Sequence, residues 1–212
     1  MEREKHILIK EEIANAITHG IGALLAIAAL VLLIVQASLH GTVWHIVSFS
    51  VFGFTLVALY FASTLYHSIP FDAAKRIFHK LDHIAIYWLI AGTYTPFCLT
   101  ALRGWIGWTL FGVVWALAIG GTVVKSISVG RYVRLSTYFY VGMGWVVLLA
   151  IKPLYESVST ACFTWLILGG VAYTGGTYFF LKERWLYNHS IWHMFVLAGS
   201  ICHFFAVLYL LD

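Results

Sequence analysis

The chain has 212 residues, of which 61% are hydrophobic and only 10% are charged. Soluble domains carry about 25% charged residues, and a mean hydropathy of +0.88 does not fit a protein surrounded by water. The composition therefore excludes an ordinary soluble enzyme and gives no indication of a nucleic-acid partner. It is typical of a protein that crosses a membrane several times.

Seven apolar runs follow a polar N-terminal segment, and each is close to the roughly 20 residues that a helix needs to cross a bilayer. The runs cover residues 17–38, 44–67, 82–102, 106–126, 135–151, 162–181 and 190–211. The connections between them are short. We therefore expect an all-α integral membrane protein, with residues 1–212 forming a single domain that folds as a seven-transmembrane helix bundle.

Lysine and arginine are distributed unevenly between the connections. All thirteen of them, except Arg103 and Lys152, lie before the first run or in the connections that share a side with it. Because cytoplasmic loops carry the excess of lysine and arginine, this pattern predicts a cytoplasmic N-terminus and a C-terminus outside. We see no removable signal peptide, since no small-residue cleavage site ends the first run.

Ionisable side chains occur at the ends of three runs that this topology places on the cytoplasmic side. His67 ends the second run and Asp82 begins the third. His189 and His193 begin the seventh run, four residues apart and hence on one face of a helix. Such residues are costly within a membrane and commonly mark functional sites. We therefore expect three histidines and one carboxylate to meet at one end of the bundle.

Three imidazoles with an open fourth position form the ligand set of a catalytic zinc, which lowers the pKa of a bound water to about 7. Asp82 is then a candidate general base or orienting group for that water, and less favourably a direct ligand. Ser63 lies four residues before His67, where its hydroxyl can bind a substrate carbonyl or a developing oxyanion. The alternative is that the histidines are structural and hydrogen-bonded between helices.

A second polar cluster lies at the start of the first run. Glu12, Asn15 and His19 share one helix face by their spacing of three and four residues. One interpretation is helix capping and hydrogen bonding between helices. Another is that these residues support the zinc ligands or contact a lipid headgroup, and a third is that His19 itself binds the metal.

We expect none of the remaining histidines to bind the metal. His203 lies ten residues beyond His193, which corresponds to roughly 15 Å along a helix, and it is expected to make a hydrogen bond between helices. His83 points about 100° away from its neighbour Asp82. His79 falls in the predicted loop before the third run.

Together these residues resemble the hemolysin III family, the bacterial branch of the progestin and adipoQ receptor superfamily. The resemblance covers essentially the whole chain. It is carried, in chain order, by Glu12-x-x-Asn15-x-x-Thr18-His19, Ser63-x-x-x-His67, Lys80-Leu81-Asp82-His83, Gly92-Thr93-Tyr94-Thr95-Pro96 and His189-x-x-x-His193-x-Phe195.

The resemblance implies a seven-helix protein of the bacterial inner membrane with its N-terminus inside. It implies a zinc ion near the cytoplasmic side, held by the residues that match the ligands of the adiponectin receptors: His67, His189 and His193. Asp82 matches the aspartate that bears on the zinc-bound water, and Ser63 matches a serine of the related alkaline ceramidases.

Because those relatives hydrolyse a lipid amide, the resemblance implies zinc-dependent hydrolysis of a lipid acyl amide or ester, linked to membrane lipid homeostasis. A membrane lipid is the expected substrate or ligand. Hormone binding is not implied, since the long soluble N-terminal region of the adiponectin receptors has no counterpart here. Two alternatives stay open: a non-catalytic membrane regulator or receptor with a structural zinc, and a pore-forming haemolysin. No polar stripe runs through any apolar run, which speaks against a pore.

Overall fold

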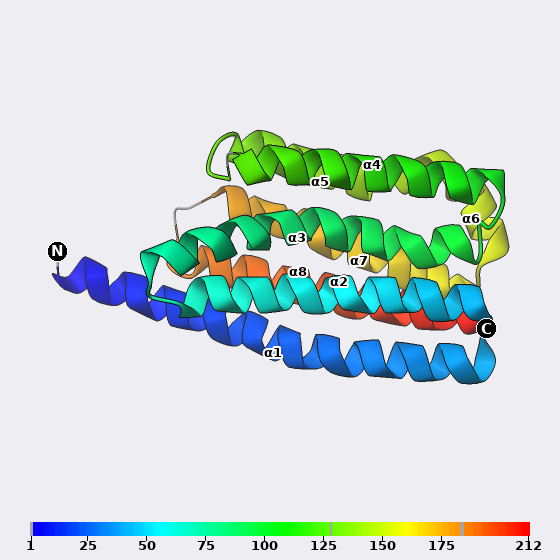
Figure 1. Ribbon diagram of the computed structural model, residues 1–212, viewed down its shortest axis with the longest axis horizontal. Helices are drawn as coiled ribbons and strands as arrows, with labels where there is room; N and C mark the ends of the chain where they lie inside the picture. Colours follow the sequence, from blue (N-terminus) through cyan, green and yellow to red (C-terminus); the bar gives the residue numbers. More distant parts are fainter. Residues whose placement is uncertain (1, 128, 183–184) are drawn as a thin grey trace.

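The computed structural model describes the backbone of residues 2–127, 129–182 and 185–212, with side chains from residue 7 onward. Long helices run roughly side by side in one elongated bundle (Figure 1), and the described part contains no strand. The elements are α1 (Glu2–His40), α2 (Val43–Ser68), α3 (Asp72–Leu99), α4 (Trp105–Ile127), α5 (Val133–Gly144), η1 (Val146–Ala150), α6 (Ile151–Ser157), α7 (Thr160–Leu181), α8 (Asn188–Leu208) and η2 (Tyr209–Leu211). The predicted all-α class is confirmed.

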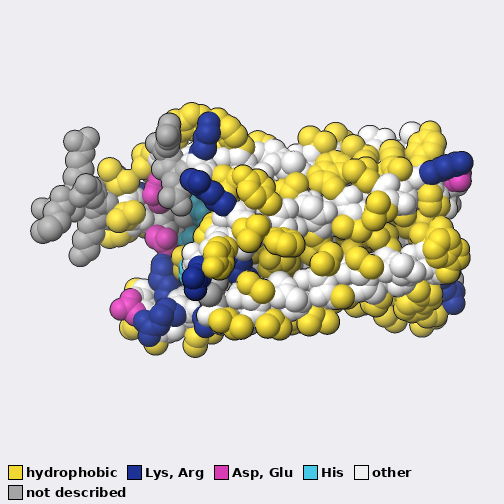
Figure 2. Space-filling model, turned by 90° about the horizontal axis from the view of Figure 1, so that it is seen from above, with side chains coloured by type: hydrophobic (Ala, Val, Ile, Leu, Met, Phe, Trp, Pro, Cys, Tyr) yellow, Lys and Arg dark blue, Asp and Glu magenta, His cyan; other side chains and the backbone are white. Residues whose placement is uncertain are grey.

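Several helical segments are long and apolar enough to cross a membrane. Within the part of the chain that the structure describes, five meet this description: Ile7–His40, Val43–Ser68, Trp105–Ile127, Val133–Ser157 and Asn188–Leu211. Figure 2 shows hydrophobic side chains over the middle of the bundle, with charged side chains gathered at its two ends. This distribution is that of a multi-pass membrane protein, because a bilayer surrounds the middle and water the ends.

The two remaining long helices belong to the same bundle. α3 has 28 residues and α7 has 22, so both match the length of a crossing helix, but they are less apolar than the other five. Each of the seven predicted apolar runs thus corresponds to helical structure. The count of seven crossings and the orientation of the termini stay predictions.

Most of the long helices pack against their neighbours in the sequence, and the first long helix also contacts the last. α1 packs on α2, α2 on α3, α3 on α4, and α7 on α8, while α1 also contacts α8. The start of α8 lies at the same end of the bundle as the end of α2 and the N-terminus (Figure 1). This arrangement brings the polar face of α1 beside the histidines of α2 and α8.

The fifth predicted run is not one continuous helix. It breaks after Gly144, where α5 gives way to the 3₁₀ helix η1. Tyr94 of α3 meets the backbone groups that the break leaves unpaired. Its hydroxyl lies 3.1 Å and 2.7 Å from the carbonyl oxygens of Met143 and Gly144, and it accepts from the amide of Val147 at 2.8 Å. Within a membrane such groups need a protein partner, so Tyr94 stabilises the break.

Candidate metal centre

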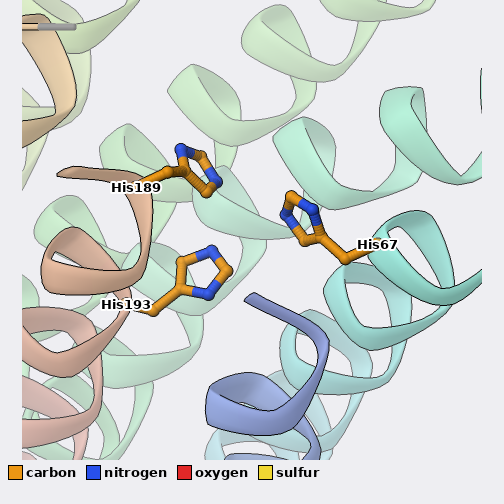
Figure 3. Close-up of side chains that lie close together, drawn as sticks. All are labelled: His67, His189 and His193. Atoms are coloured by element: carbon orange, nitrogen blue, oxygen red, sulfur yellow. The ribbon is translucent and has the colours of Figure 1, made fainter. Parts of the chain in front are cut away.

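Two helices bring three histidines together at the end of the bundle that carries the N-terminus. His67 lies in the last turn of α2, and His189 and His193 lie in the first turns of α8. The three rings face one another (Figure 3), and each offers one ring nitrogen such that all three nitrogens lie within 4.8 Å of one another. The sequence-based expectation that these residues meet is confirmed by this geometry.

The histidine group is enclosed, and several of its nitrogens have no partner. The exposed fraction is 7% for His67 and 1% for His193, and His189 is half-buried. Within the described residues, both nitrogens of His67 and Nε2 of His189 are buried without a hydrogen-bond partner. Buried polar atoms are normally paired, and imidazole is a preferred ligand of zinc, copper, iron and nickel. The three histidines can therefore hold a metal ion.

Thr18 of α1 fixes the ring of His193. Its Oγ1 lies 3.1 Å from Nδ1 of His193, and the same hydroxyl lies 2.9 Å and 3.0 Å from the carbonyl oxygens of Ala14 and Asn15. Because a carbonyl only accepts, Thr18 donates its hydrogen to its own helix and accepts one from Nδ1 of His193. This tautomer leaves Nε2 of His193 with its lone pair free for a metal.

Glu12, also on α1, lies beside His67. Its Oε2 is 3.4 Å from Nδ1 of His67 and 2.6 Å from Nζ of Lys75. Lys75 lies in the first turn of α3. A carboxylate near one ring nitrogen of a ligating histidine favours a proton on that nitrogen and metal binding by the other. Glu12 thus favours through its charge, at 3.4 Å and without a well-formed hydrogen bond, the same tautomer of His67 that the hydrogen bond to Thr18 favours in His193.

Two further contacts from α1 hold the start of α8. The hydroxyl of Ser190 donates to Oδ1 of Asn15 at 2.5 Å, and the amide of Tyr187 donates to Oε1 of Glu11 at 2.7 Å. Tyr187 precedes α8 in the left-handed backbone region, with φ of 64°. The first turn of α8, which carries His189, is therefore anchored on α1.

His19 packs directly on a member of the group. Its ring is stacked on that of His193, with centroids 3.4 Å apart and an angle of 11° between the planes. It is 3% exposed, and within the described residues neither of its nitrogens has a hydrogen-bond partner. It does not belong to the group whose nitrogens converge. Its contact with His193 places it as a neighbour that restricts the orientation of that ring.

Asp82 and Ser63 lie next to this group. Asp82 is 9% exposed on α3, close to Ser63 and to His67. Ser63 is fully buried one turn before His67 on α2, and its hydroxyl has no well-formed hydrogen bond within the described residues. Asp82 is not a member of the converging group. A carboxylate and a hydroxyl thus lie beside the histidines, and neither belongs to the group whose atoms converge.

The sequence reasoning was wrong about His79. α3 begins at Asp72, well before the apolar run, so His79 lies within a helix rather than in a loop. It stacks on Tyr66 with centroids 4.7 Å apart, and its ring is 5.0 Å from that of His83. Hydropathy locates the membrane part of a helix but not its polar extension.

The contacts of Thr18 with His193 and of Lys75 with Glu12 were also not predicted from the sequence. The spacing of Thr18 and Asn15, which share a helix face, was a signal for the first of these.

Comparison with known proteins places these residues in a family. The family described as Haemolysin-III related matches residues 7–204. The chain belongs to this family. Hemolysin-3 of Bacillus cereus is 53% identical over 201 residues, which cover 95% of this chain and 92% of that protein. The Hemolysin-3 homolog of Bacillus subtilis (strain 168) is 54% identical over 201 residues, covering 95% and 94%.

A more distant human relative spans nearly the same region. The monocyte to macrophage differentiation factor of Homo sapiens is 27% identical over 203 residues, which cover 93% of this chain and 83% of that protein. No solved structure matches the chain. The family expected from the motifs is therefore confirmed, and this member of it carries three histidines whose ring nitrogens can hold a metal ion.

Proposed function

We propose that this hemolysin III family protein is an integral membrane hydrolase that uses zinc to cleave an acyl amide or ester of a membrane lipid. The observation that carries the proposal is the convergence of three enclosed imidazoles, with unpartnered nitrogens, beside a carboxylate and a hydroxyl. Zinc is the metal proposed because three neutral histidines with an open position form its common catalytic ligand set.

The metal and the protein have separate parts in this chemistry. A bound zinc supplies Lewis acidity toward the lipid carbonyl and makes a water acidic enough to react at neutral pH. Asp82 takes the proton of the attacking water on a carboxylate oxygen and later delivers it to the leaving amine or alcohol. Ser63 donates its hydroxyl hydrogen to the carbonyl oxygen as negative charge develops there. Thr18 and Glu12 keep His193 and His67 in the tautomers that leave Nε2 free.

An apolar cavity deeper in the bundle supports a lipid substrate. It has a volume of about 140 Å³ and lies between α3, α5, α7 and α8. Phe180, on its wall, lies with its ring centroid 6.0 Å from that of His189 and 5.4 Å from that of Trp192. The wall of the cavity thus reaches the neighbourhood of His189, and the proposal has the hydrocarbon chain of the substrate occupy the cavity. With the charge pattern of the connections, the proposal places this group near the cytoplasmic side of the bacterial inner membrane.

The name of the relatives, Hemolysin-3, favours membrane lysis as a second candidate function. Lysis by a pore requires a polar path across the membrane, whereas the cavity described above has mainly apolar walls. Lipid hydrolysis also weakens a membrane and accounts for lysis without a channel. Ion conductance by the purified protein in a planar bilayer, unaffected by His67→Ala, would favour the pore.

The proposal is tested with purified protein and a panel of ceramides, phospholipids and acylglycerols, with products followed by mass spectrometry. Asp82→Asn is expected to keep its metal but to lower turnover by about 10² to 10⁴-fold, as for a removed general base. Asp72→Asn is the matched control, because Asp72 is an exposed carboxylate at the start of the same helix. Two results together would instead support a regulator with a structural metal. The wild-type protein would bind zinc but cleave no lipid, and Asp82→Asn would keep its cellular role.

A further inference from the structure

One buried histidine takes no part in the metal centre but lines the apolar cavity. His203 of α8 is 8% exposed and forms part of the cavity wall together with Tyr173, whose ring centroid is 5.3 Å away. His203 is close to Gly169 of α7, where any side chain would collide with its ring. A polar ring is therefore built into a predominantly apolar wall.

The hydrogen bonding of His203 fixes which of its nitrogens is free. Nε2 lies 3.2 Å from the carbonyl oxygen of Leu166. Because that oxygen only accepts, Nε2 carries the hydrogen, and in a neutral ring Nδ1 is then an acceptor. Nδ1 is buried and has no partner within the described residues. A charged ring is costly at this depth, so the structure leaves a single hydrogen-bond acceptor without a donor.

A molecule in the cavity can supply the missing donor, because His203 is part of the cavity wall. Buried acceptors are normally paired, and the other polar groups nearby are already engaged. The hydroxyl of Tyr173 lies 2.7 Å from Oγ of Ser200, which also accepts from Tyr60 at 2.7 Å. An occupant with an apolar body and one hydroxyl-like donor beside His203 therefore complements this wall best.

We propose that the cavity binds a lipid acyl chain with a hydroxyl group near its middle, and that Nδ1 of His203 accepts a hydrogen bond from this hydroxyl. His203 follows His193 by ten residues on one helix, so it lies roughly 15 Å beyond the histidine group. This inference rests on the proposed lipid hydrolysis, which places the carbonyl end of the acyl chain at the histidine group. At that distance the middle of a long acyl chain meets His203.

The experiment measures binding without turnover. Purified full-length protein in lipid nanodiscs is titrated with stearic acid and with stearic acids that carry a single hydroxyl near the carboxyl end, the middle or the methyl end. The mid-chain hydroxyl is expected to bind about three- to tenfold more tightly than plain stearic acid, the range for one hydrogen bond. The other two positions are expected to show no gain.

Variants of the cavity wall assign the preference to His203. His203→Leu is expected to bind plain and mid-chain hydroxylated stearic acid equally, while His203→Gln, whose side chain retains an acceptor, keeps part of the preference. Val196→Ala is the matched control, because Val196 lies on the same helix and lines the same cavity. It is expected to keep the full preference.

Equal affinity for all four fatty acids in the wild-type protein overturns the inference, and so does a mid-chain preference that survives in His203→Leu. The first result means that Nδ1 is satisfied by a water molecule instead. The outcome is separate from that of the proposed hydrolysis. A clear mid-chain preference in a protein that cleaves no lipid refutes the hydrolase activity but supports the hydroxyl site at His203. Lipid cleavage without the preference refutes only the hydroxyl site.

Discussion

Replacing Thr18 by valine removes the hydroxyl that accepts a hydrogen bond from His193, while keeping the shape of the side chain. In the native protein this contact is 3.1 Å long, and it fixes the tautomer in which Nε2 of His193 is free to bind a metal. Mutations of such supporting groups typically lower metal affinity 10- to 100-fold, which corresponds to about 1.4 to 2.7 kcal/mol. We expect a zinc Kd raised by that factor in Thr18→Val.

The assay is competition for zinc between the purified protein in detergent and a chromophoric chelator. Thr64→Val is the matched control, since among the described residues the hydroxyl of Thr64 bonds only to the carbonyl oxygen of Tyr60 in its own helix, at 2.7 Å. Its zinc affinity is expected to stay unchanged. In a His193→Ala background, Thr18→Val is expected to have no further effect. Unchanged affinity in Thr18→Val, or an equal loss in Thr64→Val, would refute the reasoning.

Two further predictions concern stability, measured as thermal unfolding in detergent. A methyl group on Gly121 would meet the ring of Tyr87, whereas one on its neighbour Gly120 meets nothing within 4 Å among the described residues. Gly121→Ala is therefore expected to lose about 1 to 3 kcal/mol of stability, and Gly120→Ala is expected to lose none. Similar melting temperatures for the two variants would contradict this packing. Tyr94→Phe leaves the amide of Val147 without its acceptor and is expected to lose about 1 to 3 kcal/mol. A wild-type melting temperature in Tyr94→Phe would show that the broken helix does not depend on this hydroxyl.

Much of the architecture follows from hydropathy, because a bilayer imposes a minimum apolar length on every crossing helix. That constraint locates all seven helical regions, but it says nothing about where helices continue into water. α3 therefore starts at Asp72 rather than near residue 82. The break after Gly144 was not foreseen, because it depends on Tyr94, which is distant in the sequence and supplies the missing hydrogen bonds.

The site was foreseen in part for a similar reason. His67, His189 and His193 each lie at a run end that the lysine and arginine count assigns to one side, so their meeting could be inferred from topology. The contact between Thr18 and His193 could not, since it depends on how α1 is rotated against α8. Helix periodicity gives the face that a residue occupies on its own helix but not the partner that this face meets.

The central claim is that His189 and His193, with His67, hold a metal ion. The most direct measurement is the zinc content of the purified protein by mass spectrometry of the metal, compared between two double variants. His189→Ala/His193→Ala is expected to lose the zinc, about one ion per chain for a three-histidine site. His79→Ala/His83→Ala removes another pair four residues apart, with rings 5.0 Å from each other, and is expected to retain it. Full zinc content in the first variant, or loss only in the second, would contradict the account.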